Sequence, residues 1–276
     1  MGLKKIRGYI ILLFISVFLC VLCRSEIAEI SKVSRLRPEG IESEGFRKQT
    51  VNDNVYDLIR TSDSPGEYLA VYWLESRFGR EDVDITPEDA ARLERKWRNI
   101  PGWEEYLDAC AAIWDDLLFF PVTGLDDENK VSYVDSWMYE RTYKGDRGHE
   151  GTDIISEKNI RGVIPVISMT DGVVENIGWL ELGGYRVGIR APRGAYFYYA
   201  HLDSYSDFKE GDNVKAGDLL GFMGDTGYGK KEGTRGKFPV HLHVGIYIRH
   251  GENELSVNPY PALKYLEDKR AGFQTA

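Results

Sequence analysis

The chain has 276 residues, 42% of them hydrophobic, and a formal net charge of −9 at pH 7. This length is sufficient for one or two domains with a buried core. The acidic balance excludes the strongly basic surface that nucleic-acid binding requires, so no nucleic-acid partner is expected.

The chain opens with an apolar segment. Residues 9–23, YIILLFISVFLCVLC, carry no charge and follow the basic start MGLKKIRG. The segment is somewhat shorter than the roughly 20 residues of a membrane span, and it lacks the small-residue pattern of a signal-peptide cleavage site. We expect residues 1–24 to be a membrane anchor, with a single pass through the cell membrane and the bulk of the chain on the extracytoplasmic side. The alternatives are secretion after signal cleavage and lipid attachment at Cys20 or Cys23, which the bulky residues before each cysteine fit poorly.

Residues 25–52 are charged and poor in aromatic side chains, which is typical of a linker or stalk. Residues 53–125 then show helical periodicity, with expected helices within residues 64–78, 86–100 and 102–120. Ser64 and Thr86 are the predicted N-caps of the first two helices, and a proline follows each of them. The sequence therefore predicts a small α-helical domain with an aromatic core, whose role is open and could include an envelope protein partner.

From residue 130 to residue 268, short apolar runs alternate with Gly, Asp and Asn. This texture predicts antiparallel strands joined by glycine-rich hairpins, and therefore a mainly β domain after the helical one. The runs are GVIPVISM at 162–169, DGVVENIGW at 171–179, YRVGIRA at 185–191, AYFYYAHL at 195–202 and HLHVGIYI at 241–248.

All five histidines lie in this β-rich half. His149 has Asp153 four residues after it, and His201 ends an aromatic strand. His241 and His243 are two apart, so a strand places both on the same face. Two imidazoles that face the same way are neutral, separately hydrogen-bonded or bridged by a cation.

Cys110 is the one cysteine outside the apolar run. A disulfide framework is therefore excluded after the anchor, and any metal site there must be built from histidine and carboxylate. His250, in the turn RHGENE, is expected to be solvated.

The motif HEGTD, the histidine of YYAHL and the downstream HLH, in this order, resemble those of the lysostaphin-type, LytM-like zinc endopeptidases of bacterial cell walls. The resemblance covers residues 132 to 262, about half the chain. It implies Zn²⁺ as cofactor and hydrolysis of peptide bonds in peptidoglycan stem peptides or cross-bridges. Carried over by motif, it implies three zinc ligands (His149, Asp153 and His243), a catalytic pair whose general base stays open (His201 and His241), and Tyr143 as an oxyanion donor or a packing residue.

The chain departs from the family pattern at residues 227–240, GYGKKEGTRGKFPV, a longer basic insertion that we expect to border the substrate groove. We expect the substrate groove to have further walls formed by Tyr198, Tyr199 and Trp179. The alternative function is a non-catalytic cell-envelope or sporulation assembly module on the same fold, which the complete donor set disfavours. A biotinyl- or lipoyl-type carrier with Lys215 at a hairpin tip would leave the histidines unexplained.

Overall fold

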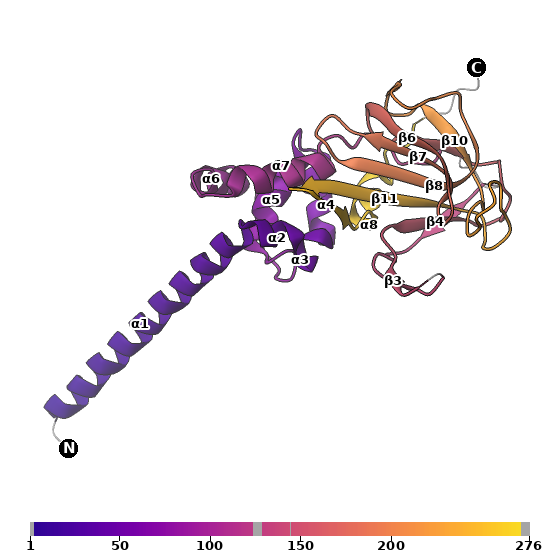
Figure 1. The fold of residues 1–276 in the computed structure, drawn as a ribbon. Coiled ribbons are helices and arrows are strands. Elements are labelled where there is room, and N and C mark those ends of the chain that lie inside the picture. The colour runs from indigo at the N-terminus through magenta and orange to yellow at the C-terminus, as the bar shows by residue number, and fades with distance from the viewer. Residues whose placement is uncertain (1–2, 124–128, 144, 272–276) are drawn as a thin grey trace.

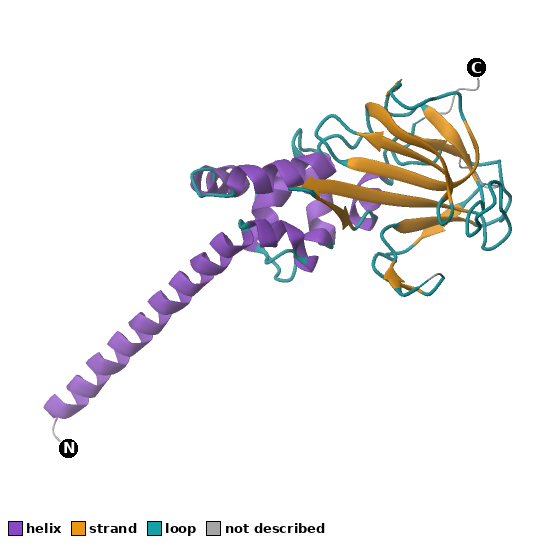
Figure 2. Ribbon diagram, viewed as in Figure 1, coloured by secondary structure: helices purple, strands orange, loops and turns teal. Residues whose placement is uncertain are grey.

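The computed structural model describes residues 3–123, 129–143 and 145–271, and it places a helical N-terminal region before a sheet-rich domain (Figures 1 and 2). Helix α1 (Leu3–Arg35) projects from the body as a rod (Figure 1). Within the described residues it is the one helix long and apolar enough to cross a membrane, with a mean hydropathy of 2.4 over its apolar window. A signal sequence near an N-terminus would meet the same criteria. The side chains of residues 1–8, which include the expected basic flank, lie outside the description.

A small helical domain follows, as predicted, and its aromatic side chains form its core. Its helices are α2 (Pro38–Glu42), α3 (Glu44–Arg47), α4 (Asp53–Arg60), α5 (Pro65–Glu75), α6 (Pro87–Trp97) and α7 (Trp103–Trp114). Phe46 packs edge-on against Trp73 and Tyr106, with ring centroids 6.0 and 5.5 Å apart. Trp73 and Trp114 are fully buried, so these rings stabilise the domain through apolar burial.

Two helix boundaries differ from the sequence prediction. Thr86 caps α6 by accepting a hydrogen bond from Asp89 N at 3.1 Å, but Ser64 makes no such bond. Asp115, which follows α7, caps α5 instead by accepting from Gly66 N at 2.7 Å. Helix α7 ends at Trp114, because the chain then leaves the helix to reach the sheet, where Leu118 N donates to Met169 O.

The expected stalk over residues 25–52 was wrong from Arg35 onward. Leu36, Ile41 and Phe46 are buried in the core of the helical domain, and Arg35 Nη2 donates to Leu74 O at 2.6 Å. The prediction failed because this segment has few apolar residues, spread over short helices, so its composition resembles that of a disordered linker. The expected change of domain near residue 125 falls on residues 124–128, outside the description.

The rest of the chain forms an antiparallel sheet, which confirms the mainly β prediction. Its main path runs β1 (Val131–Tyr133), β4 (Thr152–Ser156), β11 (His241–His250), β8 (Tyr196–Tyr205), β7 (Gly184–Arg190), β6 (Gly172–Leu180) and β9 (Asn213–Val214). Strand β12 (Asn253–Val257) pairs with β11, and β10 (Leu219–Met223) pairs with both β5 (Pro165–Ile167) and β8. A separate hairpin joins β2 (Glu140–Arg141) to β3 (Arg147–Gly148), and helix α8 (Tyr260–Leu266) follows β12.

Strand β11 carries the site on one face and the core on the other. Leu242, Val244 and Ile246 are fully buried, so the alternation of a strand turns His241 and His243 to the opposite face. In the register, His243 pairs with Asp153 of β4 and with Ala200 of β8.

His250 lies at the junction of the two domains, so the expectation of a solvated turn was wrong. Its Nδ1 is 3.2 Å from Glu42 Oε1 of α2, and its Nε2 is 3.2 Å from Glu105 Oε1 of α7. Its side chain is 9% exposed. Arg47 Nε donates to Ser256 O at 2.8 Å nearby. Strand β11 therefore extends to the helical domain, and polar contacts hold the two together.

Candidate metal centre

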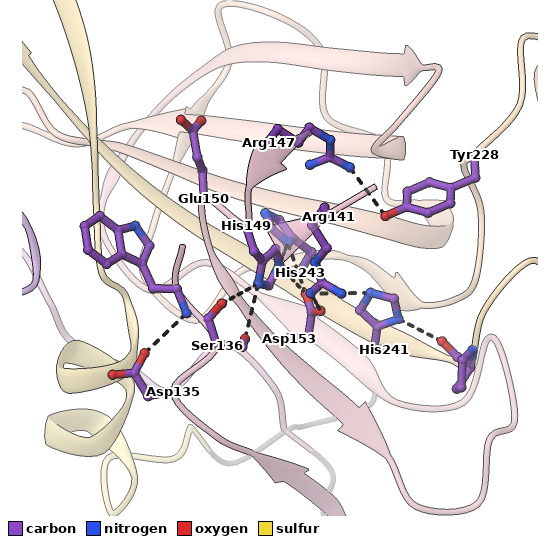
Figure 3. Close-up of polar contacts among 12 residues, drawn as sticks. Asp135, Ser136, Arg141, Arg147, His149, Glu150, Asp153, Tyr228, His241 and His243 are labelled. Atoms are coloured by element: carbon purple, nitrogen blue, oxygen red, sulfur yellow. Dashed lines mark hydrogen bonds and ion pairs between the residues drawn. The ribbon is translucent and has the colours of Figure 1, made fainter. Parts of the chain in front are cut away.

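Three donor atoms from β11, β4 and the segment before β4 converge at one point (Figure 3). His149 Nε2 is 2.9 Å from His243 Nδ1 and 3.0 Å from Asp153 Oδ1. His243 Nδ1 is 3.1 Å from the same carboxylate oxygen. In a tetrahedral site with bonds of about 2.0–2.1 Å, two ligand atoms are about 3.3 Å apart. The triangle therefore has nearly the size that a metal ion requires.

The hydrogen bonds of His149 show why a cation fits this triangle. Its Nδ1 lies 3.0 Å from the Ser136 carbonyl oxygen, which only accepts, so Nδ1 carries the proton. In the neutral ring, Nε2 is then a bare acceptor that faces Asp153 and His243. A proton on His243 can form a hydrogen bond to only part of this group of lone pairs, whereas a metal ion can accept a lone pair from all three atoms. The group can therefore hold a metal ion.

Asp153 is held as an anion. Burial alone would raise the pKa of its carboxyl, but the close contacts with the imidazoles of His149, His243 and His241 outweigh burial and lower that pKa. Arg141 Nη2, from the β2–β3 hairpin, lies 2.7 Å from Asp153 Oδ2 (Figure 3). The second oxygen is thus fixed by a cation while Oδ1 faces the histidines.

His201 and His241 lie beside the triangle, with ring centroids 4.7 Å apart. His201 Nδ1 donates to Thr226 O at 2.7 Å, and His241 Nδ1 donates to Pro239 O at 2.7 Å. Each Nε2 is therefore the unprotonated nitrogen of the neutral ring. Burial lowers the pKa of both imidazoles, and that of His201 falls well below its usual value.

The position of His201 depends on a backbone conformation that strand alternation does not predict. Odd-numbered neighbours in β8 such as Phe197 and Tyr199 are fully buried in the core. His201 has a φ of +63°, in the left-handed region, which is unfavourable for a residue with a Cβ. Its N–H is held by Gly183 O at 2.8 Å. This conformation turns the ring to the site.

Gly151 explains the glycine between His149 and Asp153. A Cβ at this position would lie 2.4 Å from His243 Cε1 and 2.5 Å from Val244 O. Only glycine lets the His243 ring lie so close to this backbone. Gly151 therefore allows the position of one donor because it carries no side chain.

Tyr143 lies at the rim rather than on the three donor atoms. Its ring stacks on Tyr228, with centroids 4.4 Å apart and planes 6° apart. Its hydroxyl donates to Tyr228 O at 2.9 Å. Tyr228 in turn packs edge-on toward His201.

The donor atoms open into a cavity of about 730 Å³ that crosses the face of the sheet. Tyr228 and Phe238 line it, so the insertion at 227–240 does border the groove, as expected. Tyr198 lines it as well, but Tyr199 points into the core and accepts from Met169 N. Trp179 packs edge-on against Tyr185.

Sequence reasoning missed several groups in this site. Arg141, Arg147 and Arg186 line the cavity, and Ser136 orients His149. None belongs to a recognisable motif. Long-range strand pairing brings them together, and no local spacing indicates it.

Comparison with known proteins agrees with this geometry. Residues 31–116 match the LytM N-terminal domain, and residues 147–259 match peptidase family M23. An L-Ala–D-Glu endopeptidase of Bacillus subtilis (strain 168) is 44% identical over 137 residues, which cover 49% of this chain and 40% of the relative. Lysostaphin of Staphylococcus staphylolyticus is 32% identical over 110 residues, which cover 39% of this chain and 21% of the relative. The chain thus spans less than half the length of these curated relatives.

A solved structure from Ruminococcus gnavus ATCC 29149, assigned as a glycyl-glycine endopeptidase LytM, matches over most of the chain. It is 52% identical, has a TM-score of 0.83, and the match covers 89% of this chain and 99% of that one. Both the helical and the sheet-rich parts are therefore shared. The chain belongs to peptidase family M23, with a LytM N-terminal domain ahead of its peptidase domain.

Proposed function

We propose that the chain is a membrane-anchored, zinc-dependent endopeptidase that hydrolyses peptide bonds in peptidoglycan. One observation carries this proposal: three donor atoms within about 3 Å of each other adjoin two further neutral imidazoles in one cavity. A metal-dependent peptidase needs donors that hold the ion and neighbouring groups that accept and deliver protons, and this cavity holds both. A non-catalytic module would need neither.

His149, Asp153 and His243 are the proposed ligands, and zinc is the proposed metal. Two neutral imidazoles and one carboxylate form a donor set that catalytic zinc sites use, with a further coordination position left for water or substrate. Zinc bound there would polarise the scissile carbonyl and lower the pKa of a water molecule. Ser136 and Arg141 would keep His149 and Asp153 in their orientation.

His201 and His241 are the proposed acid–base pair. Both Nδ1 protons are committed to backbone carbonyls, so each ring offers one Nε2 to the reaction. Because burial keeps both rings neutral, one Nε2 can take a proton from the attacking water. The other, once protonated, can deliver a proton to the leaving amine.

Tyr143 is proposed to donate a hydrogen bond to the oxyanion that develops on the scissile carbonyl. Its hydroxyl now donates to Tyr228 O. It would therefore have to exchange this partner for the substrate. The stacked Tyr228 ring would hold the phenol near the cavity during the exchange.

Two relatives give different substrate chemistries. One is named for an L-Ala–D-Glu bond and one is assigned to glycyl-glycine bonds. We propose peptidoglycan peptides as the substrate class on this basis. The apolar part of α1 is proposed to anchor the chain in the cell membrane with the groove outside the cytoplasm, and the helical domain remains a candidate surface for an envelope protein.

The test combines metal content and hydrolysis on the full chain in detergent. The wild type, His149→Ala and His250→Ala are compared, because the last removes a histidine at the domain junction instead of the site. We expect about one zinc per chain and new amino termini from peptidoglycan for the wild type and the control, and neither for His149→Ala. Zinc without cleavage of any peptidoglycan would favour the non-catalytic assembly module.

A further inference from the structure

Arg186 of β7 lines the cavity without an anionic partner. Its Nη1 is shielded from solvent and makes no hydrogen bond to any residue that the structure describes. Among the residues that the structure describes, no carboxylate oxygen lies within 4.0 Å of its guanidinium nitrogens. A half-buried guanidinium is normally paired, because a charge removed from water is costly without a partner. The Arg186 guanidinium therefore lacks a counter-ion among the described residues, and an anionic ligand could supply one.

Three of the four acidic residues that line the same cavity are already engaged by other cations. The fourth, Glu150, is exposed, and its carboxylate lies more than 4.0 Å from the Arg186 guanidinium nitrogens. Glu175 Oε2 is 2.5 Å from Arg190 Nε, and its Oε1 is 2.7 Å from Arg190 Nη2. Glu254 Oε1 is 3.3 Å from Arg190 Nη2, and Asp153 is held by Arg141. The protein thus offers these carboxylates to other arginines and leaves Arg186 for a ligand.

Tyr198 lines the same cavity as Arg186, and the Tyr205 hydroxyl accepts a hydrogen bond from Arg186 N at 3.2 Å. Burial raises the pKa of Tyr198 well above its usual value and raises that of Tyr205 to about 12, and Arg186 opposes the increase in both. Both hydroxyls therefore stay protonated at neutral pH. A carboxylate here would find a cation beside neutral hydrogen-bond donors.

The strand register places Arg186 within reach of the reacting bond. His243 of β11 pairs with Ala200 of β8, and Tyr185 and Val187 pair with Leu202 and Tyr199 on the other side of β8. Strand β8 lies between β11 and β7 (Figure 1). Arg186 is therefore two strands from His243, about 10 Å at the usual strand spacing. An extended peptide covers that distance in about three residues.

We infer that Arg186 binds a free carboxylate of the substrate within about three residues of the scissile bond, and so favours acidic stem peptides over neutral oligoglycine. A glycine bridge has no side-chain carboxylate to offer, whereas a stem peptide with D-glutamate does. This inference rests on the proposed function for its substrate class.

The experiment uses two matched peptides and an oligoglycine on the full chain in detergent with zinc. One peptide is L-alanyl-γ-D-glutamyl-L-lysyl-D-alanine amide, and the other has the glutamyl α-carboxylate replaced by a carboxamide. The oligoglycine is also amidated at its C-terminus, so that the glutamyl group of the first peptide is the one carboxylate on offer. We expect the wild type to prefer the acid over the amide by roughly 10- to 100-fold in kcat/KM, the range of a hydrogen bond to a charged group. Oligoglycine should be cleaved no better than the amide.

Three variants separate the charge of Arg186 from general effects. Arg186→Gln should lower kcat/KM for the acid by the same factor and leave the amide within about 2-fold. Arg186→Lys should keep part of the preference, because the charge stays but the planar fork is lost. Arg92→Gln, on an exposed part of α6, removes one positive charge outside the cavity and should change nothing. Equal losses on both peptides in Arg186→Gln, or no preference in the wild type, would overturn the inference.

A binding measurement makes the result independent of hydrolysis. Calorimetric titration of the metal-free full chain with the two peptides should show tighter binding of the acid in the wild type and no difference in Arg186→Gln. If this difference is seen but no peptide or peptidoglycan is cleaved, the proposed function fails and the carboxylate site stands. Equal or undetectable binding of both peptides overturns the site whatever the cleavage shows.

Discussion

Gly151→Ala should weaken metal binding without adding a polar group or a charge. The new Cβ would lie 2.4 Å from His243 Cε1, 2.6 Å from His243 Nε2 and 2.5 Å from Val244 O, where ordinary contacts begin at 3.4 Å. The shortfall is about 1 Å, and two of these three atoms belong to a metal-ligand candidate. Either the His243 ring moves by this amount or β4 separates from β11.

Both responses enlarge the donor triangle. We expect metal affinity to fall roughly 10- to 100-fold, comparable with the loss of an orienting partner. Overpacking should lower the free energy of unfolding by about 1–3 kcal/mol. For a chain of this size, this corresponds to a decrease in Tm of roughly 2–12 °C.

The assay is competition for zinc against a chromophoric chelator, together with thermal unfolding of the full chain. Gly148→Ala is the matched control, because its Cβ would meet the flexible end of the Met138 side chain, at 2.5 Å from Cε, while the nearest backbone atom, Met138 Cα, lies at an ordinary 3.5 Å. Gly151→Ala that binds zinc as tightly as the wild type and unfolds at the same temperature would refute the role given to this glycine.

Three further results are expected. His201→Ala should lower kcat roughly 10²- to 10⁴-fold while metal content stays at the wild-type value; loss of the metal would make His201 a ligand instead of an acid–base group. Removing the metal with a chelator should lower Tm by roughly 5–10 °C relative to protein with zinc at 100 times its Kd; an unchanged Tm would show that the donors hold no metal in the folded chain. Tyr143→Phe should lower kcat at least about 10-fold with little change in KM, measured by release of amino termini, and an unchanged kcat would remove Tyr143 from the reaction.

The sequence predicted those parts of the molecule that depend on local pattern. The aromatic run of β8 and the alternation of β11 identified strands, and two histidines two residues apart were expected to share a face. His241 and His243 do so because strand geometry has a period of two. The cap of α6 by Thr86 also follows from local chemistry.

The remaining features depend on contacts between distant segments. His201 turns to the site through a left-handed φ that no periodicity indicates. Arg186 meets the groove because β7 pairs with β8, and Arg141 reaches Asp153 from a separate hairpin. The prediction of Ser64 as the N-cap failed because the carboxylate of Asp115, directly after α7, accepts the hydrogen bond instead.

The contacts between α1 and the helical domain bear on how far from the membrane the peptidase groove can act. Arg35 is bonded to Leu74 O, and His250 joins the helical domain to β11, so the peptidase groove is tied to the direction of α1. The charged part of α1, from Arg24 to Arg35, is about 18 Å long as a helix. In the proposed anchored state, this helical segment would hold the peptidase domain at a fixed distance from the membrane, which a flexible linker would not do. Hydrolysis would then be confined to a thin layer of the cell wall at that distance, and inserting residues into the helical segment should move the layer outward.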